Sequence, residues 1–484
     1  MATLPKGHPK LLNAWAFYDW ANSVYSLVIA SAVFPIFYEN LFKNNHQDKV
    51  SFCGTDVKAT AMISFVTAFA FLIVALFSPI LSGIADYVGN KKSFLRFFCY
   101  LGGLSCIGLY WFDFENLMTG YTFYFFGLIG FWSSLVFYNS YLPDIAFPEQ
   151  QDRVSARGFS MGYLGSTLLL IFNLAMVMFP DAFFISDSME AMRISFVTVG
   201  VWWIGFSHIT YYYLPKGTRN NVKLSKDFIF KGFRELKLVW CQLQENLALK
   251  RYLYSYFVFI MAVQTVMLVA TYFGATEIAW ESPDQKTMGL IISILVIQLV
   301  AVLGAFLTSR ASAKFGNLNV LIFLNAFWAV LCAFAYFVET PVEFYTTAGF
   351  VGLVMGGIQS LARSTYSKLL PETKDTTSFF SFYDVTEKVG IVIGMSIYGI
   401  IDQITGSMRN AIVFLGAFFI IGFLLLLLMN VKEEKNKLDK FEIVLISLLP
   451  IIDGFFLIMN IIRKKKHKAV NIFFIILIKN IFIR

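Results

Sequence analysis

Long apolar runs alternate with short polar connections along most of the chain. A helix that crosses the hydrocarbon core of a bilayer needs about 20 mostly apolar residues, at about 1.5 Å each. Backbone groups in hydrocarbon must be satisfied within their own segment, and no run shows the two-residue alternation of a membrane barrel, so helices are predicted. The predicted spans are 14–38, 59–85, 94–112, 121–146, 155–179, 193–214, 252–278, 287–309, 318–338, 344–369, 379–401 and 410–430.

Lysine and arginine residues are strongly biased to one side of this pattern. They fill the N-terminal segment, every second connection, the longest connection and residues 432–440. The connections on the other side hold only Lys43, Lys49, Lys58, Arg193, Lys286 and Arg409. Because cytoplasmic loops carry the excess of Lys and Arg, the bias predicts that the N-terminus and residue 431 are both cytoplasmic, which requires an even number of spans.

An internal repeat divides the spans into two groups of six. Leu142-Pro143-Asp144 closes the fourth span and Leu370-Pro371-Glu372 closes the tenth. Gly89-Asn90 after the second span likewise matches Gly316-Asn317 after the eighth. Two matches at nearly one offset indicate a duplicated plan. We therefore predict an all-α membrane protein with twelve transmembrane helices in two six-helix pseudo-repeats, the plan of one large class of transporters.

This division predicts four regions. They are an N-terminal six-helix bundle at 1–214, a basic cytoplasmic linker at 215–251, a C-terminal six-helix bundle at 252–431 and a C-terminal tail at 432–484. Within the tail, residues 441–462 are apolar, but Pro450 and Asp453 interrupt them and leave halves too short to cross a bilayer. We expect an amphipathic or re-entrant tail, and a thirteenth span is the alternative.

The composition agrees with solvation by lipid. The chain is 57% hydrophobic and only 14% charged, which is more apolar surface than a water-soluble body of 484 residues can bury. The formal net charge of +8 resides between the apolar runs, so it indicates membrane topology and not nucleic-acid binding. The five cysteines show neither CxxC nor Cys/His ligand spacing. We expect no metal, no cofactor and a monomeric protein.

The first span carries the clearest polar pattern. Asp19, Asn22, Ser23 and Ser26 follow at i, i+3, i+4 and i+7, which places them on one stripe of a helix, with Tyr18 and Tyr25 on its flank. Ionisable groups inside spans cost several kcal/mol, so they are candidates for function. The stripe is predicted to line water or a solute, and the alternative is that Asp19 bonds a neighbouring helix.

Three later spans also carry polar groups. Asp384 and Lys388 on the eleventh span are four residues apart and face one way, with Glu387 beside them, so they form either a proton-carrying cluster or a static salt bridge. Gln359 and Arg363 on the tenth span bind solute or close a gate, with snorkelling of Arg363 as the alternative. Tyr138 and Asn139 end the fourth span and line a cavity or pack helices. The twelfth span, 410–430, is apolar all round and is expected to face lipid.

One pattern raises an enzymatic alternative. Gly158-Phe159-Ser160-Met161-Gly162 matches G-x-S-x-G, and His208 would lie at a similar depth, as an intramembrane Ser/His hydrolase requires. The motif's sharp elbow needs a strand–turn–helix context that the sequence lacks, and two glycines four residues apart are explained by close helix packing. We therefore predict no catalytic residues and no enzyme. An uncoupled pore or lipid scramblase is a further alternative to a transporter.

Several motifs resemble one transporter family. The stretch SGIADYVGNKK at 82–92 resembles the loop signature of the major facilitator superfamily, with Asp86, Gly89, Lys91 and Lys92 in place. In that family the acidic and basic residues form a charge latch that stabilises the outward-facing state. More narrowly, NAWAFYDWANSVYS, SARGFSMGYLGS and GGIQSLARSTYSKLLPE, which begin at residues 13, 155 and 356, look like the vacuole-effluxer family, also called the unknown major facilitator family.

The resemblance implies a secondary transporter that exports amino acids, by analogy with the fungal members, with or without a coupled proton. Its membrane is the plasma membrane in a bacterium or the vacuolar membrane in a fungus. The two groups of helices are expected to rock about a site between spans one, four, seven and ten. The predicted gate consists of charged and glycine residues at the cytoplasmic ends, where contacts break in each cycle, namely Asp86, Gly89, Lys91, Asp144, Arg157 and Arg363. Solute or proton would contact Tyr18, Asp19, Asn22, Ser23, Tyr25, Ser26, Tyr138, Asn139, Gln359, Asp384, Glu387 and Lys388.

Overall fold

The computed structural model describes residues 4–47, 49–52, 55–215 and 228–433, and the predicted tail after 433 lies outside them, as do linker residues 216–227. Residues Met1–Leu427 form one compact unit, and a second unit begins at Leu428. The elements are α1 Pro9–Val24, a π-helix η1 Tyr25–Ala32, α2 Val33–Asn44, β1 Lys49–Phe52, β2 Thr55–Lys58, α3 Ala59–Val88, α4 Lys91–Gly108, η2 Leu109–Trp111, α5 Leu117–Asn139, α6 Leu142–Ile145, α7 Pro148–Met178, η3 Pro180–Phe183, α8 Ser188–Tyr213, α9 Phe228–Glu245, α10 Leu247–Glu277, α11 Pro283–Phe315, α12 Asn317–Ala335, α13 Pro341–Leu369, α14 Thr376–Thr405 and α15 Met408–Glu433.

The long helices coincide with the predicted spans. Within the described residues, eleven helical segments are long and apolar enough to cross a membrane, with α1, η1 and α2 forming a single segment. The remaining long helix, α13, has 29 residues but is more polar, and it corresponds to the predicted tenth span. Most helices begin a few residues ahead of the apolar runs. The prediction of an all-α membrane protein is confirmed.

Local sequence explains where these helices begin and end. Helix α3 ends at Gly89, which adopts a left-handed conformation (φ 65°) and donates its N–H to the Ala85 and Asp86 carbonyls. Glycine is favoured there because a Cβ atom destabilises this conformation. Helix α13 begins with a capping box, in which the side chains of Thr340 and Glu343 each bond the other residue's backbone. The short connections are thereby fixed in place.

The first span is not a uniform α-helix. Residues Tyr25–Ala32 form the π-helical segment η1 between α1 and α2. Hydroxyl groups bond carbonyls of this part of the chain, from Ser26 Oγ to the Ser23 carbonyl at 3.0 Å and from Ser31 Oγ to the Ser26 carbonyl at 2.9 Å. Such segments are rare and recur at functional sites. The apolar pattern, which predicts one continuous helix here, did not indicate the change.

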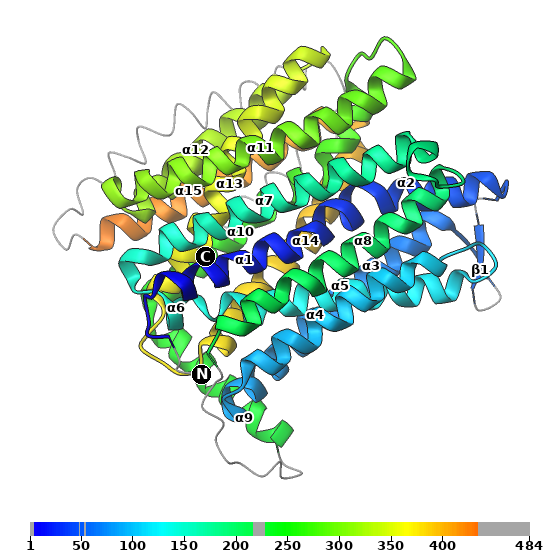
Figure 1. Ribbon diagram of the computed structural model, residues 1–484. Coiled ribbons are helices and arrows are strands. Elements are labelled where there is room, and N and C mark those ends of the chain that lie inside the picture. Colours follow the sequence, from blue (N-terminus) through cyan, green and yellow to red (C-terminus); the bar gives the residue numbers. More distant parts are fainter. Residues whose placement is uncertain (1–3, 48, 53–54, 216–227, 434–484) are drawn as a thin grey trace. The chain divides into compact units, whose positions relative to one another are not determined.

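Two further elements lie in the connections. Strands β1 and β2 form an antiparallel hairpin with Lys49 opposite Lys58 and Val50 opposite Val57, at the other end of the bundle from α6 and α9 (Figure 1). Within the predicted basic linker, α9 packs against α3 and α14 and buries Val239 and Leu243. The end that holds α6 and α9 is the one predicted to be cytoplasmic.

The packing brings the two groups of helices together. We call α1 to α8 the N-terminal set, and α10 to α15 as far as Leu427 the C-terminal set. Helix α7 packs against α11 and α13, and α14 packs against α3 and α5, so these helices form the contact between the sets (Figure 1). Other contacts, such as α11 with α13 or α1 with α7, lie within one set.

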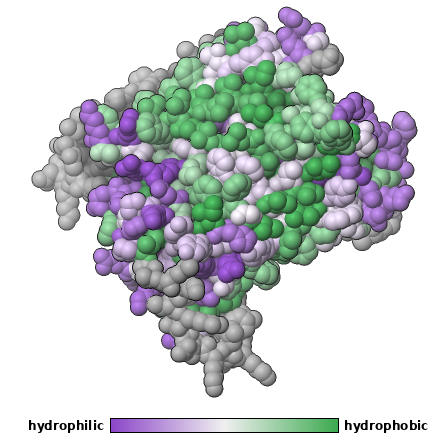
Figure 2. All heavy atoms as spheres, viewed as in Figure 1, coloured by the Kyte–Doolittle hydropathy of each residue, from purple (hydrophilic) through white to green (hydrophobic). Residues whose placement is uncertain are grey.

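The outer surface of the bundle is apolar. Large side chains of α3 and α11 point outward, with exposed fractions of 63% for Phe65, 57% for Leu76 and 58% for Leu303. Apolar residues cover the middle of the visible face and hydrophilic residues gather toward its ends (Figure 2). This distribution matches a hydrocarbon layer between two aqueous phases.

Helix α15, whose sequence is apolar on every side, is partly buried against its neighbours. Ala411, Leu415 and Phe419 are fully buried, and the Phe419 ring stacks on Trp328 of α12 with centroids 5.1 Å apart. The expectation that this span faces lipid can therefore apply to only part of its surface, because a helix without polar residues has no sequence signal that separates its lipid face from its packed face.

Candidate functional site

Arg363 on α13 lies at the centre of a polar cluster, with 3% of its surface exposed. Its Nη1 and Nη2 atoms each donate to Asp19 Oδ2 on α1 at 3.3 Å. Nε donates to Ser155 Oγ on α7, and Nη2 to the Ser155 carbonyl, both at 3.0 Å. Nη1 also donates to Asn139 Oδ1 on α5 at 3.2 Å. Among the residues that the structure describes, all hydrogen-bond acceptors of this guanidinium belong to the N-terminal set, although Arg363 belongs to the C-terminal set.

Aromatic rings of the N-terminal set surround the same guanidinium. Its carbon lies 4.9 Å from the ring centroid of Trp15, 5.5 Å from that of Tyr138 and 4.3 Å from that of Phe159. We call these three residues the aromatic cage. Cations are attracted to the faces of aromatic rings at such distances, and the attraction is greater where water is excluded. The guanidinium is therefore held by charge, hydrogen bonds and rings together.

The aromatic cage is held in place by contacts within the N-terminal set. Trp15 Nε1 donates to the Tyr138 carbonyl at 2.9 Å, and the two rings stack with centroids 4.5 Å apart. The Tyr138 hydroxyl donates to Asp19 Oδ2 at 2.8 Å. Each of these contacts joins α1 to α5, so none requires Arg363. Two of the three cage rings and the carboxylate are thus held by contacts that do not involve Arg363.

Two glycines explain how α7 approaches α1 so closely. A Cβ atom at Gly158 would overlap Asp19 Oδ2 and lie 3.0 Å from Arg363 Nη2. A Cβ atom at Gly162 would overlap Ser23 Oγ. The predicted role of the pair in helix packing has this geometry: Gly158 leaves the space that the ion pair fills.

The remaining residues of the first-span stripe make local contacts. Ser23 Oγ donates to Asn22 Oδ1 at 3.4 Å, while Asn22 Nδ2 is buried without a hydrogen-bond partner among the described residues. The ring of Tyr25 stacks on Phe131 with centroids 4.8 Å apart, and Tyr18 is fully buried beside Tyr138. Asn22 therefore offers a free amide donor one turn from Asp19.

A second charged cluster lies on α14. Lys388 Nζ is 2.5 Å from Asp384 Oδ1 and 3.7 Å from Glu387 Oε2, and it lies 3.8 Å from the ring centroid of Trp132 on α5. Gln264 of α10 donates to Glu387. Asp384 Oδ2 is buried without a hydrogen-bond partner among the described residues. The cluster thus contains two carboxylates and one ammonium group.

The residues on either side of the turn between α3 and α4 form a third set of contacts. The Asp86 carboxylate accepts the backbone N–H groups of Ser378 at 2.7 Å and Thr377 at 3.3 Å, at the N-terminus of α14. A carboxylate is favoured at that end of a helix by the free N–H groups and the helix dipole. Lys91 bonds Asp144 Oδ2 at 2.5 Å and also reaches Thr376 Oγ1 at 3.0 Å. Asp86 and Lys91 therefore both join the two sets.

Asp152, which was not among the predicted site residues, forms a fourth set of contacts. On α7, Asp152 accepts from Lys368 Nζ at 2.6 Å, Asn317 Nδ2 at 2.8 Å and Ser312 Oγ at 3.1 Å. These partners come from α13, α12 and α11. Asn317 occupies the repeat position of Asn90, so the repeat itself was a signal that this end of the C-terminal set contacts the other set. Asp152 precedes the predicted span and was not considered.

Two other candidates differ in what they join. Arg157 on α7 bonds Asn13 on α1, so its contact stays within the N-terminal set. Gln359 on α13 accepts from the Tyr163 hydroxyl of α7 at 3.0 Å and so connects the sets. Around Arg363, the fifth span takes the place of the seventh in the predicted group of one, four, seven and ten. The α7 residues concerned, Ser155 and Phe159, lie within the predicted fifth span. A central site between spans one, four, seven and ten stays a prediction.

Ser160 and His208 are not brought together. Ser160 lies within the continuous helix α7, and its hydroxyl donates to the Val302 carbonyl at 3.5 Å. The ring of His208 bonds the Tyr100 hydroxyl at 3.1 Å and the Ile204 carbonyl at 2.8 Å. A serine nucleophile needs its base within hydrogen-bond reach. The hydrolase alternative therefore has no support from this geometry.

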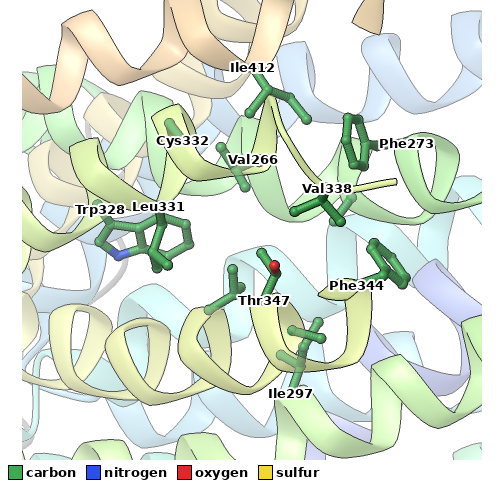
Figure 3. A pocket seen from close by; sticks show the side chains of 14 residues that line it. Val266, Phe273, Ile297, Trp328, Leu331, Cys332, Val338, Phe344, Thr347 and Ile412 are labelled. Atoms are coloured by element: carbon green, nitrogen blue, oxygen red, sulfur yellow. The ribbon is translucent and has the colours of Figure 1, made fainter. Parts of the chain in front are cut away.

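A separate cavity lies inside the C-terminal set (Figure 3). Apolar side chains such as Val266, Phe273, Trp328 and Phe344 line it. Its one hydroxyl, from Thr347, is already bonded to the Glu343 carbonyl at 2.8 Å. The cavity has no charged group to hold a polar solute, so the Arg363 cluster is the stronger candidate site.

Comparisons with known proteins agree with this arrangement. A family model described as "Vacuole effluxer Atg22 like" matches residues 7–439. The MFS-type transporter YxiO of Bacillus subtilis strain 168 is 30% identical over 447 residues, which cover 90% of this chain and 99% of that protein. Autophagy-related protein 22 of Eremothecium gossypii is 23% identical, over 91% of this chain and 95% of that protein.

Solved transporter structures share the fold. The E. coli fucose:proton symporter FucP superposes with a TM-score of 0.63 at 13% identity, covering 87% of this chain and 97% of the symporter. A bacterial homologue of the iron transporter ferroportin, in an outward-facing state, gives a TM-score of 0.61 at 12% identity, with coverage of 87% and 98%. At these identities the likeness concerns the fold alone, which is that of the major facilitator superfamily.

Proposed function

This chain belongs to the Atg22-like vacuole-effluxer family of major facilitator transporters, and we propose that it exports amino acids by alternating access, with Arg363 and Asp19 as the contact that opens and closes its cytoplasmic end. The single observation that carries the proposal is that the buried guanidinium of one helix set has all its described acceptors in the other set. Relative movement of the two sets must break these bonds.

The other contacts between the sets support the same assignment. Asp86 with the α14 N-terminus, Lys91 with Asp144 and Thr376, and Asp152 with Lys368 occur at the same end of the bundle. We infer that they form one cytoplasmic gate with Arg363. The solute would contact Asn22, Tyr138 and Gln359 when the gate is open.

A coupled proton is the second part of the proposal. Asp384, Glu387 and Lys388 carry one negative charge in excess when all are ionised, and Asp384 and Lys388 are buried. An unbalanced charge inside a membrane protein is costly, and a proton can neutralise it. We infer that this cluster binds the proton. The membrane would be a plasma or vacuolar membrane, with the N-terminus and residue 431 in the cytoplasm.

Counterflow in proteoliposomes tests the function. Liposomes that contain the purified chain are loaded with single amino acids, and uptake of the same labelled amino acid is followed. We expect uptake for at least one member of the panel and a loss of at least about tenfold in Asp19→Asn, which removes the charge that holds Arg363. Uptake that is equal in wild type and Asp19→Asn would remove Asp19 from the mechanism. Absence of uptake across the panel would contradict the substrate class.

A further inference from the structure

We propose that the aromatic cage together with Asp19 is a binding site for an organic cation, and that Arg363 occupies this site as a tethered substitute whenever the cytoplasmic end is closed. The inference rests on the proposed transport function and identifies the chemical group of the solute that the N-terminal set recognises, namely a guanidinium or ammonium group.

The hydrogen bonds and ring contacts of the Arg363 guanidinium all come from one helix set. The guanidinium of Arg363 sits among Asp19, Asn139 and Ser155, and the cage residues Trp15 and Phe159 complete its surroundings. All of these residues belong to the N-terminal set. When the sets separate, Arg363 leaves with α13, and a pocket with one carboxylate, three further acceptor atoms and three rings stays behind.

Most of the pocket is held by contacts that do not involve its occupant. Trp15 and Tyr138 hold each other by a stacked pair of rings and a hydrogen bond, and Tyr138 holds the Asp19 carboxylate. Gly158 keeps the space open, because any Cβ atom there would fill it. A preorganised site of this kind binds a cation without first having to order its own side chains.

The charge of Asp19 also favours a cation in this pocket. Once Arg363 has left, Asp19 is a carboxylate in a largely apolar surrounding, and an unpaired charge there is strongly unfavourable. An organic cation restores the pairing, and aromatic faces select it over a neutral solute of the same shape. Solute and Arg363 therefore exclude each other, so binding of the solute favours the open cytoplasmic end.

Chemical replacement of the missing guanidinium tests the inference. Arg363→Ala vacates the pocket, and methylguanidinium is titrated against methylurea, a neutral molecule of similar shape, with the melting temperature in detergent and tryptophan fluorescence as readouts. We expect Arg363→Ala to bind methylguanidinium at least about tenfold more tightly than methylurea. The wild-type chain, whose pocket is filled, should bind it at least about tenfold more weakly than the variant does.

Two double variants locate the binding. Asp19→Asn in the Arg363→Ala background should abolish the preference for methylguanidinium. Phe159→Leu in the same background, at a half-buried position, should weaken the binding of methylguanidinium about two- to tenfold. If Arg363→Ala does not keep a single melting transition, Arg363→Gln replaces it. Equal binding of methylguanidinium and methylurea, or binding that survives Asp19→Asn, overturns the inference. This binding measurement does not depend on transport. A chain without transport activity would contradict the proposed function, while the titration would still show whether the cation site exists.

Discussion

Two buried ion pairs in this protein use the same chemistry in opposite ways. Asp19 and Arg363 come from α1 and α13, and the guanidinium makes five hydrogen bonds to the N-terminal set. Asp384 and Lys388 are four residues apart on α14, and Lys388 reaches the other set through the ring of Trp132. Movement between the sets must break the first pair, while the second moves as part of one helix. A buried ion pair is therefore sensitive to movement between the two helix sets only when its two residues come from different sets.

The largest expected effect comes from Arg363→Ala. The substitution leaves Asp19 buried without its cation, and breaking such a pair costs about 3–5 kcal/mol. We expect amino-acid counterflow to fall by at least about a hundredfold, to the level of liposomes without protein.

Arg409 provides the matched control for that variant. It is also partly buried, but it bonds Glu277 and the carbonyls of Tyr336 and Val338, all in the C-terminal set. Arg409→Ala should lower the melting temperature while counterflow stays within about threefold of wild type once protein amounts are matched. A loss of flux as large as that of Arg363→Ala would mean that general destabilisation explains both variants.

Glycine substitutions compare the space around the two pairs. A Cβ atom at Gly158 would overlap Asp19 Oδ2, whereas one at Gly390, beside the second pair, would make ordinary contacts of 3.4–3.6 Å with Met261. We expect Gly158→Ala to destabilise by about 1–3 kcal/mol through overpacking, and Gly390→Ala to change stability by less than about 1 kcal/mol. Melting temperatures in one detergent measure the difference, and equal shifts would show that α7 has room to move away from α1.

Glu387→Gln separates proton coupling from solute binding. It removes the excess negative charge of the α14 cluster and keeps an amide that can still contact Gln264. We expect uptake driven by a pH gradient to fall about tenfold, which corresponds to about 1.4 kcal/mol, while counterflow without a gradient is unchanged. Unaltered gradient-driven uptake would remove this cluster from coupling and leave it as a static link.

The smallest expected effect concerns Asp152 and Lys368. Their atoms lie 2.6 Å apart, but the Lys368 side chain is 26% exposed, so water screens the interaction. A double-mutant cycle with Asp152→Asn and Lys368→Met should give a coupling of about 0.5–1 kcal/mol in thermal stability. A coupling near zero would restrict the cytoplasmic gate to Arg363, Asp86 and Lys91.

Sequence reasoning predicted the helices better than the contacts between them. The spans follow from apolar length, and the turn at Gly89 follows from local chemistry, since both depend on neighbouring residues. Asp19 and Arg363 were each recognised as costly charges inside spans, but their pairing joins residues 344 positions apart and depends on tertiary packing. A pattern of residue types along the sequence does not indicate which distant residues will pack together.

Several important residues were not singled out as site residues, although Trp15, Ser155 and Phe159 lie in motifs that resemble the vacuole-effluxer family. Trp15 and Phe159 look like ordinary apolar residues of a span, and their role depends on the position of one guanidinium. Ser155 acts partly through its backbone carbonyl, which every residue has. Asp152 lies ahead of an apolar run, in a helix that begins at Pro148. Each was missed because its environment comes from another part of the chain.

The π-helical segment Tyr25–Ala32 changes how the first span must be interpreted beyond Asp19. A turn with i→i+5 bonding holds about one residue more than an α-turn, so the outer half is rotated by roughly 100° from the phase that an unbroken helix would have. The polar stripe therefore ends at this segment, and beyond it Phe34 stacks on Tyr124 at 4.4 Å and Phe37 meets Phe196 edge-on at 5.1 Å. The first span thus changes at this segment from a face with polar side chains to one with buried aromatic side chains.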